Sequence, residues 1–383
     1  MTGRHLALLR RTSPLGFGAL LILILVLGVA LSDRPGIAHA TPIPRATALA
    51  LAEKGLTVAE SEWVNRSHHW YNEVLADRAK YPQATVWGAV PLFEALDAVA
   101  AAAPTRANLT AVERFARGAE NYWDPTMGGY APYPGDRGHA LTWFDDNGWW
   151  GLAFFDAYRV THQARLLTDA ERAFTFIATQ GWDTAGGGGM WWNTAHPYLA
   201  GEPLAAGSLL GADLYSVTGN ALYRTDVDGW ISWADQHFAA GNGLYWRTGT
   251  DPTPTPYVEG TMIEAQELLC QAGDSARCSE ASALASAAMS RFEARLNMGP
   301  QYDVIYLHQM LAFGQATGQS QWLNLAELMA DDALAKARTG PNTYLRAWDG
   351  TPMTEHQAQP NMLQTQAATV ELFAWLANFG PSP

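Results

Sequence analysis

Helices of two kinds alternate along this chain, and this alternation limits the folds open to it more than any other feature. Four predicted helices are apolar on nearly all sides and poor in charge, at residues 146–161, 202–218, 303–317 and 361–378. Helices of this kind must be buried on most sides. Three others are amphipathic and are expected to be half exposed, at residues 167–180, 276–296 and 321–338. We expect about twelve helices in all.

The connections between the helices alternate in length as well. A buried helix is followed by a short turn, such as SVTGNAL or ATGQSQW, and a long segment rich in Gly, Pro and aromatics leads to the next buried helix. Six hairpins of one inner and one outer helix would form an all-α (α/α)6 barrel with the long loops around one mouth, where functional residues usually lie. The alternative is an open solenoid of helix pairs. We favour the closed barrel because no self-similar repeat motif is present.

The first forty residues have the layout of an export signal. Three arginines, Arg4, Arg10 and Arg11, precede an apolar run at residues 14–31 and a small-x-small cleavage site at residues 38–40. We predict a signal peptide at 1–40. An uncleaved membrane anchor is the alternative, because the run is close to the roughly 18 residues that span a bilayer. Either way the remaining 343 residues (383 − 40) are expected in the extracellular space or the cell envelope.

Charge and cysteine content narrow the possible partners. The formal net charge is −13, with 24 Lys and Arg against 37 Asp and Glu, so neither nucleic acid nor an anionic polymer is an expected partner. Cys270 and Cys278 are a disulfide candidate in an exported protein, with two free thiols as the alternative. No Cys or His pairs stand at zinc-ligand spacing, so we predict no metal site.

The long loops carry many tryptophans and tyrosines. Their flat apolar faces and polar edges suit sugar rings. Alternatively, each ring only closes the end of the barrel, and for any one of them this is the simpler explanation. The residues are Tyr122, Trp123, Tyr130, Tyr133, Trp143, Trp191, Trp192, Tyr198, Tyr245, Trp246, Tyr257, Tyr344 and Trp348.

Two adjacent acids, Asp145 and Asp146, begin a predicted buried helix. A capping box from Thr142 to Asp145 would explain one of them. Two acids facing a rim of tryptophans point instead to glycoside chemistry, which needs two carboxyl groups about 5–5.5 Å apart for retention or about 6.5–9.5 Å apart for inversion. Neighbouring like charges separate their pKa values, so one carboxyl can stay charged while the other holds a proton.

Other motifs are less informative. The stretch GGGGMWWN at residues 186–193 lacks the Lys-Ser/Thr of a phosphate loop, and its glycines are expected to let the backbone pass close to a ligand. Asp226 and Asp228 lack the other ligands of a calcium loop. The sequence contains neither HExxH nor GxSxG.

Two motifs resemble those of glycoside hydrolase family 76, the endo-α-1,6-mannanases and their relatives. WFDDNGWWGLAFFDAYRVTH is similar to the family's Asp-Asp motif, and GGGGMWWN to its Gly-Gly-Gly, Trp-Trp-Asn signature. The resemblance implies a single (α/α)6-barrel catalytic domain at 41–383, expected to be a monomer that binds a polysaccharide or oligosaccharide without a cofactor. It implies retention, with Asp145 as nucleophile and Asp146 as acid/base. Asn147, Trp143, Trp191, Trp192, Asn193, Trp246, Tyr257, Glu259 and Trp348 are the expected substrate contacts.

Two positions depart from the family pattern. Gly148 replaces the usual Ala, and Tyr257-Val258-Glu259-Gly260 stands where relatives often have Tyr-Asn-Gln-Gly. We read the second change as the loss of two amides that would bind sugar hydroxyls, which affects the substrate more than the chemistry. The expected activity is therefore hydrolysis of an α-1,6-type mannoside. A cell-envelope transglycosylase of the same fold and a non-catalytic glycan-binding barrel are the alternatives.

Overall fold

The computed structural model describes residues 40–75, 83–138, 141–292, 296–353 and 361–380. Nearly all of the predicted export signal lies outside the described residues. Ile37–Pro383 form one compact unit, and only this unit is discussed below. Among the described residues, no helix combines the length and the apolar character needed to cross a membrane.

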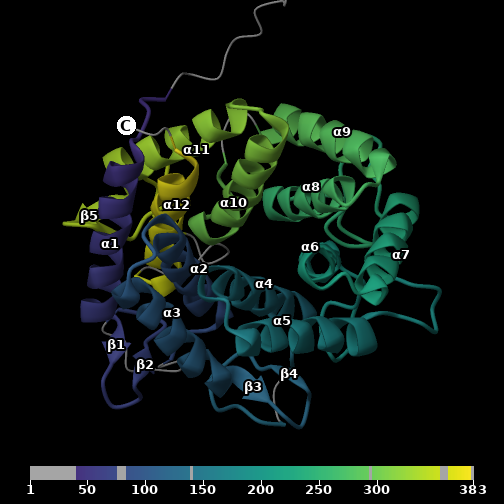
Figure 1. Ribbon diagram of the computed structural model, residues 1–383, viewed down its shortest axis with the longest axis horizontal. Helices are drawn as coiled ribbons and strands as arrows, with labels where there is room; N and C mark the ends of the chain where they lie inside the picture. Colours follow the sequence, from purple (N-terminus) through teal and green to yellow (C-terminus); the bar gives the residue numbers. More distant parts are fainter. Residues whose placement is uncertain (1–39, 76–82, 139–140, 293–295, 354–360, 381–383) are drawn as a thin grey trace, which may run out of the picture. The chain divides into compact units, whose positions relative to one another are not determined.

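In the described part of the chain, twelve α-helices form two concentric layers (Figure 1). The inner layer consists of α2 (Val86–Ala102), α4 (Phe144–Thr161), α6 (Gly201–Thr218), α8 (Pro256–Gln271), α10 (Pro300–Thr317) and α12 (Leu363–Phe379). The outer layer consists of α1 (Arg45–Glu62), α3 (Arg106–Ala119), α5 (Ala164–Phe176), α7 (Ala221–His237), α9 (Ser275–Phe292) and α11 (Gln321–Asp332). Each inner helix packs against the next, and α12 packs against α2. The ring is therefore closed, which confirms the predicted (α/α)6 barrel and excludes the open solenoid.

Small residues bring the helices of the barrel close together. A Cβ atom at Gly148 on α4 would lie 2.4 Å from the Cβ of Ala206 on α6. A Cβ atom at Gly55 on α1 would lie 2.3 Å from a methyl group of Val370 on α12. Both distances are far below van der Waals contact, so these positions require glycine as the helices now stand.

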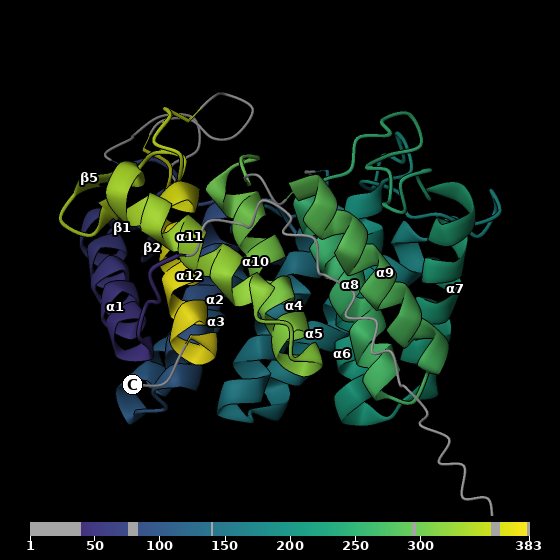
Figure 2. The ribbon, with the colours of Figure 1, turned by 90° about the horizontal axis from the view of Figure 1, so that it is seen from above.

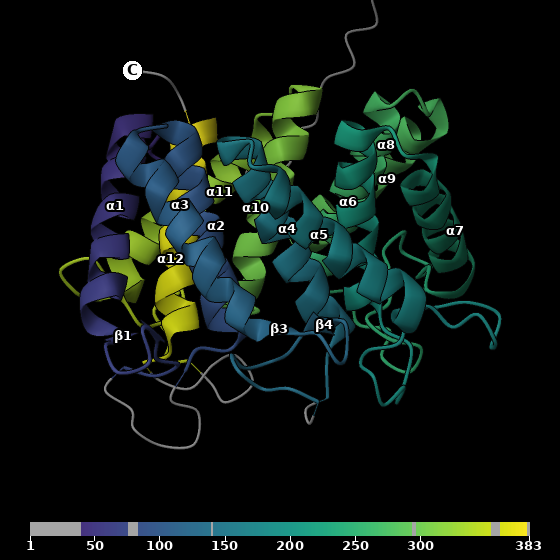
Figure 3. The same cartoon turned by 60° about the horizontal axis from the view of Figure 1, so that its bottom comes forward.

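The long and short connections gather at opposite ends of the barrel (Figures 2 and 3). The long connections carry three small antiparallel hairpins: β1 (Val64–Asn65) with β2 (Trp70–Tyr71), β3 (Trp123–Asp124) with β4 (Gly129–Tyr130), and β5 (Arg338–Gly340) with β6 (Thr343–Tyr344). At the other end, His162, Gly219 and Gly318 terminate α4, α6 and α10 in the left-handed conformation, with φ of 56°, 65° and 72°. This conformation turns the chain sharply into the next outer helix. We call the ends the loop mouth and the turn mouth.

The predicted helix boundaries differ from the observed ones mainly at the loop mouth. The inner helices α4 and α10 begin at Phe144 and Pro300, two and three residues before the predicted starts. The outer helices α5 and α11 end earlier than predicted and continue as single π-turns at Ile177–Gly181 and Ala333–Ala337. The expected capping box is absent, because the N-cap of α4 is Trp143 and the Thr142 backbone pairs with Thr194 instead.

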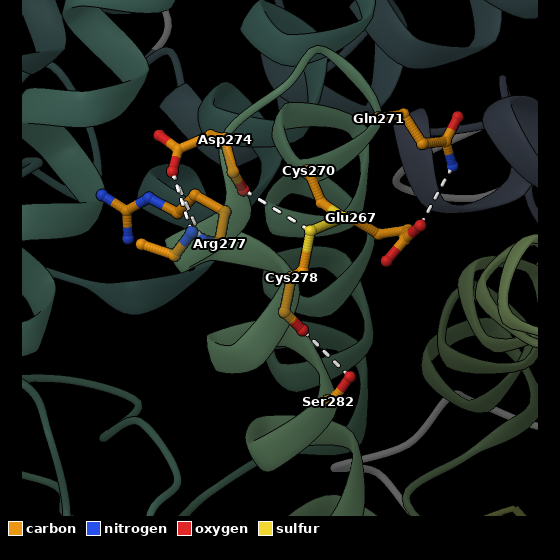
Figure 4. The surroundings of a disulfide bond; sticks show 8 residues. Glu267, Cys270, Gln271, Asp274, Arg277, Cys278 and Ser282 are labelled. Carbon is orange, nitrogen blue, oxygen red and sulfur yellow. Dashed lines mark hydrogen bonds between the residues drawn. A yellow bond between two sulfur atoms is a disulfide. The ribbon is translucent and has the colours of Figure 1, made fainter. Parts of the chain in front are cut away.

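A disulfide joins Cys270, near the end of α8, to Cys278 in the first turns of α9 (Figure 4). It closes a short loop in which Asp274 accepts hydrogen bonds from the backbone N–H groups of Ala276 and Arg277. The disulfide lies at the turn mouth, where it ties an inner helix to its outer partner.

Candidate active site

Acidic residues stand in the first turn of four inner helices at the loop mouth. They are Asp145 and Asp146 on α4, Glu202 on α6, Glu259 on α8 and Asp303 on α10. All five are at most 7% exposed. The positive end of a helix dipole favours an acid at each of these positions, so position alone does not separate structural from chemical roles.

Two of these acids anchor the loop that precedes their helix. Glu259 accepts the backbone N–H of Tyr245 at 2.9 Å. Asp303 accepts the N–H groups of Met298 and Gly299 at 3.3 and 3.1 Å. Their hydrogen bonds satisfy backbone donors that the loops would otherwise leave buried and unpaired.

The anchoring contact recurs around the barrel with different side chains. Asn147, the fourth residue of α4, accepts the N–H of Tyr130 at 2.6 Å, and its amide donates to the carbonyls of Tyr130 and Trp143. Gln366, the fourth residue of α12, accepts the N–H of Tyr344 at 2.8 Å. Glu259 is the fourth residue of α8. An acceptor at this position therefore holds a loop tyrosine backbone in three of the six hairpins.

Asp145 and Asp146 do not serve as loop anchors. Within the described part of the chain, Oδ1 of Asp145 is buried without a hydrogen-bond partner. Leaving a buried carboxyl oxygen unpaired costs on the order of 1–3 kcal/mol, and such a cost is typical of a functional site.

Glu202 lies beside the pair and has its own partners. Its Oε1 accepts Nε of Arg247 at 2.6 Å and the hydroxyl of Tyr257 at 3.2 Å. Oε2 of Glu202 has no partner among the described residues. The loop mouth thus holds three carboxyl groups close together, with the half-exposed guanidinium of Arg247 beside one of them.

Burial raises the pKa of both aspartates. For Asp145, burial and the nearby charges of Asp146 and Glu202 raise the pKa well above its usual value, while backbone N–H groups at the helix start lower it in part. Burial raises the pKa of Asp146 to about 7. The neighbouring carboxyls titrate as a pair, and the raised pKa values favour a state in which the pair holds a single proton. One charged and one protonated carboxyl is the state that retaining glycoside chemistry needs.

Aromatic rings from four inner helices surround the pair. Trp149 on α4 contacts Tyr257 on α8 and Trp87 on α2, with ring centroids 6.1 and 6.5 Å apart. Tyr302 on α10 packs against Tyr257 at 5.2 Å and against Trp87 at 5.0 Å. The charges of Asp145 and Asp146 help raise the pKa of Tyr302, which places its hydroxyl in the field of the pair.

The second predicted motif lies next to the first. Trp143 forms an antiparallel bridge with Asn193, and the N–H of Phe144 donates to the carbonyl of Trp192 at 3.1 Å. Trp192 stacks on Tyr198, with centroids 5.1 Å apart, and meets the edge of Trp143. These half-buried rings form an aromatic wall at the start of α4.

Two glycines of the run have a role in packing. Gly188 and Gly189 have φ of 107° and 102°, and a Cβ atom on either would approach the ring of Trp233 to 2.6 and 2.8 Å. The glycines therefore let the backbone pass over Trp233 of α7. This packing accounts for both glycines, and their expected approach to a ligand stays a prediction.

The predicted substrate contacts fall into two groups. Trp143, Trp191, Trp192 and Trp246 are half-buried in the loops. Tyr257 is 2% exposed and donates to Glu202, and we keep it in the first group because its ring packs against Trp149 and Tyr302 beside the acid pair. Asn147, Asn193, Glu259 and Trp348 are at most 3% exposed and make internal hydrogen bonds. Trp348, for example, donates its indole N–H to Thr369 at 2.9 Å. We therefore leave this second group out of the proposed substrate contacts.

Five residues of the site were not predicted from the sequence: Glu202, Arg247, Trp87, Trp149 and Tyr302. The signal that could have found Glu202 is an acid in the first turn of a buried helix, a pattern it shares with Asp145 and Asp146. Trp87 and Tyr302 occupy the second and third positions of their helices, at the same mouth.

A sequence model of glycosyl hydrolase family 76 matches residues 64–265, more than half of the chain and all of the acid pair's surroundings on α4 and α6. The chain belongs to this family. A comparison with curated protein sequences finds no match.

Solved structures of family 76 share the fold. An α-mannanase from Bacteroides thetaiotaomicron is 20% identical, with a TM-score of 0.76 over 87% of this chain and 96% of that one. The α-1,6-mannanase of Salegentibacter sp. HEL1_6 is 17% identical, with a TM-score of 0.69 over 87% and 99%. An inactive variant of that enzyme, with two adjacent aspartates replaced by alanine, has been solved with α-1,6-mannotetrose. Dfg5 of Chaetomium thermophilum, in complex with glucosamine, is 14% identical with a TM-score of 0.67 over 88% and 91%.

Proposed function

We propose that this protein is a retaining glycoside hydrolase that cleaves α-1,6-linked mannan outside the cytoplasm. The observation that carries the proposal is the Asp145–Asp146 pair, buried at the loop mouth among aromatic rings, with a free carboxyl oxygen and raised pKa values. Family membership and the solved α-mannanases support the substrate class. The predicted export signal and the disulfide support the location.

The proposed reaction has two steps. The carboxylate of Asp145 attacks the anomeric carbon, the glycosidic C–O bond breaks, and the proton of Asp146 passes to the leaving oxygen. Asp146 then takes a proton from water, which attacks the anomeric carbon and releases Asp145. In the free protein the single proton can reside on either carboxyl, because the two titrate together. A glycosidic oxygen next to Asp146 would draw the proton there.

The aromatic wall and Glu202 have supporting roles in this proposal. Trp143 and Trp192 offer ring faces at the edge of the site, on which the C–H face of a mannose unit can stack. The negative charge of Glu202 raises the pKa of Asp145. It therefore opposes loss of the last proton from the pair. Arg247 and Tyr257 hold the Glu202 carboxyl in place.

The test is product analysis with α-1,6-mannan and a defined α-1,6-mannooligosaccharide. The wild type should release shorter oligosaccharides whose new reducing ends are initially the α-anomer. Asp145→Asn and Asp146→Asn should lose at least about a thousandfold in kcat and still bind the oligosaccharide. Asp226→Asn, on the outer helix α7, is the matched control and should be unaffected. Equal turnover in all variants, or none in the wild type, would refute the proposal.

Azide separates the roles of the two aspartates. In Asp145→Ala, azide should attack from the vacated face and give the β-mannosyl azide. In Asp146→Ala, a glycosyl-enzyme forms first from a substrate with a good leaving group, and azide then gives the α-anomer. The opposite pairing of variants and anomers would exchange the two roles.

Transglycosylation is the second candidate, and one observation favours it. The fold also matches Dfg5 in complex with glucosamine, an amino sugar instead of a mannoside. Adding glucosamine or a mannooligosaccharide as acceptor distinguishes the two activities, because a transglycosylase yields products longer than its donor even when water is in large excess.

A further inference from the structure

A second group of polar side chains, one buried and two half-buried, comes together from three inner helices, away from the acid pair. Glu94 on α2, Asp156 on α4 and His308 on α10 each offer one ligand atom, and these atoms lie within 4.8 Å of one another. They come from the middle and the C-terminal halves of three inner helices, whereas Asp145 and Asp146 stand at the N-terminal end of α4.

Asp156 and His308 of this group line a large cavity that opens at the turn mouth. The cavity has a volume of about 680 Å³, and its lining includes Asp97, Asp156, Asp213, Glu264 and His308. A narrower cavity, lined by Trp87 and Trp149 near the acid pair, reaches Glu94 and His308 from the other side. Small solutes can therefore reach the group from the turn mouth without passing the proposed catalytic site.

Within the described residues, protein cations neutralise the carboxyl groups here only in part. Arg159 is the one cation that acts on them among the described residues; its side chain is 64% exposed and lies 3.7 Å from Asp156. An exposed guanidinium contributes little to neutralising buried charge. Glu371 adds a further buried carboxyl close to Glu94.

Two buried carboxyl groups in or near this group of side chains have oxygens without a hydrogen-bond partner among the described residues. Asp97 is 0% exposed and lines the cavity, and neither of its carboxyl oxygens has a hydrogen-bond partner in the described part of the chain. Oε2 of Glu94, which is 6% exposed, also has none. The Glu94 and Asp156 side chains are hydrogen-bonded to each other, so a cation would replace the proton that they share. Burying unpaired carboxyl groups is costly unless they are neutralised or coordinate a metal.

We propose that Glu94, Asp156 and His308 bind a divalent transition-metal cation, with Zn²⁺ as the representative, that links α2, α4 and α10 and stabilises the barrel. Two carboxylates and one imidazole form an N/O ligand set typical of zinc, and the nitrogen ligand disfavours Mg²⁺ and Ca²⁺. Two ligand atoms that are each about 2 Å from a cation lie at most about 4 Å from one another. The ligand atoms here lie within 4.8 Å of one another, so the distances between them must shorten by less than about 1 Å.

The surroundings of His308 suit a metal ligand. Its ring stacks on Trp375 with centroids 3.6 Å apart, which fixes the ring plane. The side-chain amide of Gln309 lies 3.4 Å from Nδ1 and can present either its oxygen or its nitrogen. Such an outer contact sets the tautomer and leaves the other ring nitrogen for the cation. The site is independent of the proposed glycosidase activity.

The test measures cation binding and stability on the purified full chain after treatment with EDTA and buffer exchange. Calorimetric titration with ZnCl₂ should show one equivalent of Zn²⁺ bound. Zn²⁺ should also raise the thermal unfolding midpoint more than Mg²⁺, Ca²⁺ or spermidine added at the same concentration of positive charge. Spermidine tests the rival explanation, an acidic cavity that attracts any cation.

Two variants that remove the same charge form the matched comparison. Glu94→Gln should weaken zinc binding by at least roughly tenfold, whereas Asp213→Asn, which lines the same cavity outside the ligand set, should leave it within about threefold of the wild type. His308→Gln should behave as Glu94→Gln does; if it fails to fold, the other two variants still decide. Equal effects of Glu94→Gln and Asp213→Asn, no stoichiometric uptake, or equal stabilisation by spermidine would overturn the proposal.

Discussion

The carboxyl of Glu259, at the start of α8, accepts the backbone N–H of Tyr245 in the preceding loop at 2.9 Å. Asn147 and Gln366 make the same contact with Tyr130 and Tyr344. The acceptor in this repeated contact can therefore be an amide or a carboxyl. The departure from the family pattern at Glu259 therefore falls on a residue that anchors a loop.

Glu259→Gln is expected to preserve activity and to stabilise the protein near neutral pH. Burial raises the pKa of Glu259 well above its usual value. The unfolded chain releases this proton above about pH 4.3, while the folded chain keeps it. Wild-type stability therefore falls as pH rises through this window, by up to about 1.4 kcal/mol per pH unit from this group. Gln keeps the acceptor and removes the pH dependence.

Urea unfolding at pH 5 and pH 7 measures this effect. The stability advantage of Glu259→Gln over the wild type should grow between the two values. Glu259→Ala is the comparison: it leaves the Tyr245 N–H unpaired and should cost about 1–3 kcal/mol at both pH values. An advantage of Gln that is the same at both pH values would contradict a neutral carboxyl in the folded state.

Gly148→Ala is expected to destabilise the barrel even though relatives often carry Ala there. The new Cβ would lie 2.4 Å from the Cβ of Ala206 on α6, and overpacking of this kind costs about 1–3 kcal/mol. The better helix propensity of Ala returns at most about 1 kcal/mol. Because one methyl group opposes one methyl group, Ala206→Gly should restore stability in the double variant.

A double-mutant cycle of thermal or chemical unfolding tests this pairing. The coupling between the two substitutions should be favourable and of order 1–2 kcal/mol. Additive effects would mean that α4 and α6 separate to accommodate the methyl group. The close approach of Gly148 and Ala206 would then contribute nothing to the free energy of unfolding.

The two-layer fold was predictable because the composition of each helix indicates whether it belongs to the inner or the outer layer. The apolar stretch at residues 202–218 has no polar face, so α6 had to be internal, and the amphipathic stretch at 321–338 had to be external. The alternation of short and long connections then placed the loops at one mouth. The order of apolar and polar residues within a helix indicates how much of that helix is buried, so these patterns can be recognised from the sequence alone.

The site was predictable only where its parts are neighbours in sequence. Asp145 and Asp146 are adjacent, so their mutual charge effect could be inferred from sequence. Glu202 and Tyr302 reach the pair from other inner helices, and only ring closure brings them together. Glu94, Asp156 and His308 are likewise on three helices, so their spacing along the chain resembles no ligand motif. Asn147 and Trp348 were expected at the substrate because residue type does not distinguish an internal hydrogen bond from an external one.

Removal of the disulfide is expected to destabilise the protein without changing the site. Cys270 and Cys278 close a loop with a sequence separation of 8, for which chain-entropy estimates give about 2–3 kcal/mol. The double variant Cys270→Ser/Cys278→Ser should lower the unfolding midpoint and leave KM unchanged, because the bridge lies at the turn mouth. A change in KM together with unchanged stability would contradict this placement. The wild type under reducing conditions should behave as the double variant does.

The pH dependence of kcat/KM should report the acid pair of the free protein. Burial raises the pKa of Asp146 to about 7, and the pKa of Asp145 lies well above its usual value. Below the lower of the two pKa values both carboxyls hold protons and no nucleophile is charged, so kcat/KM should rise about tenfold per pH unit up to that point. It should fall again only when the second proton leaves.

Glu202→Gln removes a charge that raises the pKa of Asp145, so this variant should move the alkaline limb to lower pH and leave the stereochemistry of the product unchanged. Initial rates on an α-1,6-mannooligosaccharide between pH 4 and 10 measure both limbs. An alkaline limb that does not move in Glu202→Gln would show that Glu202 does not influence the proton on the pair.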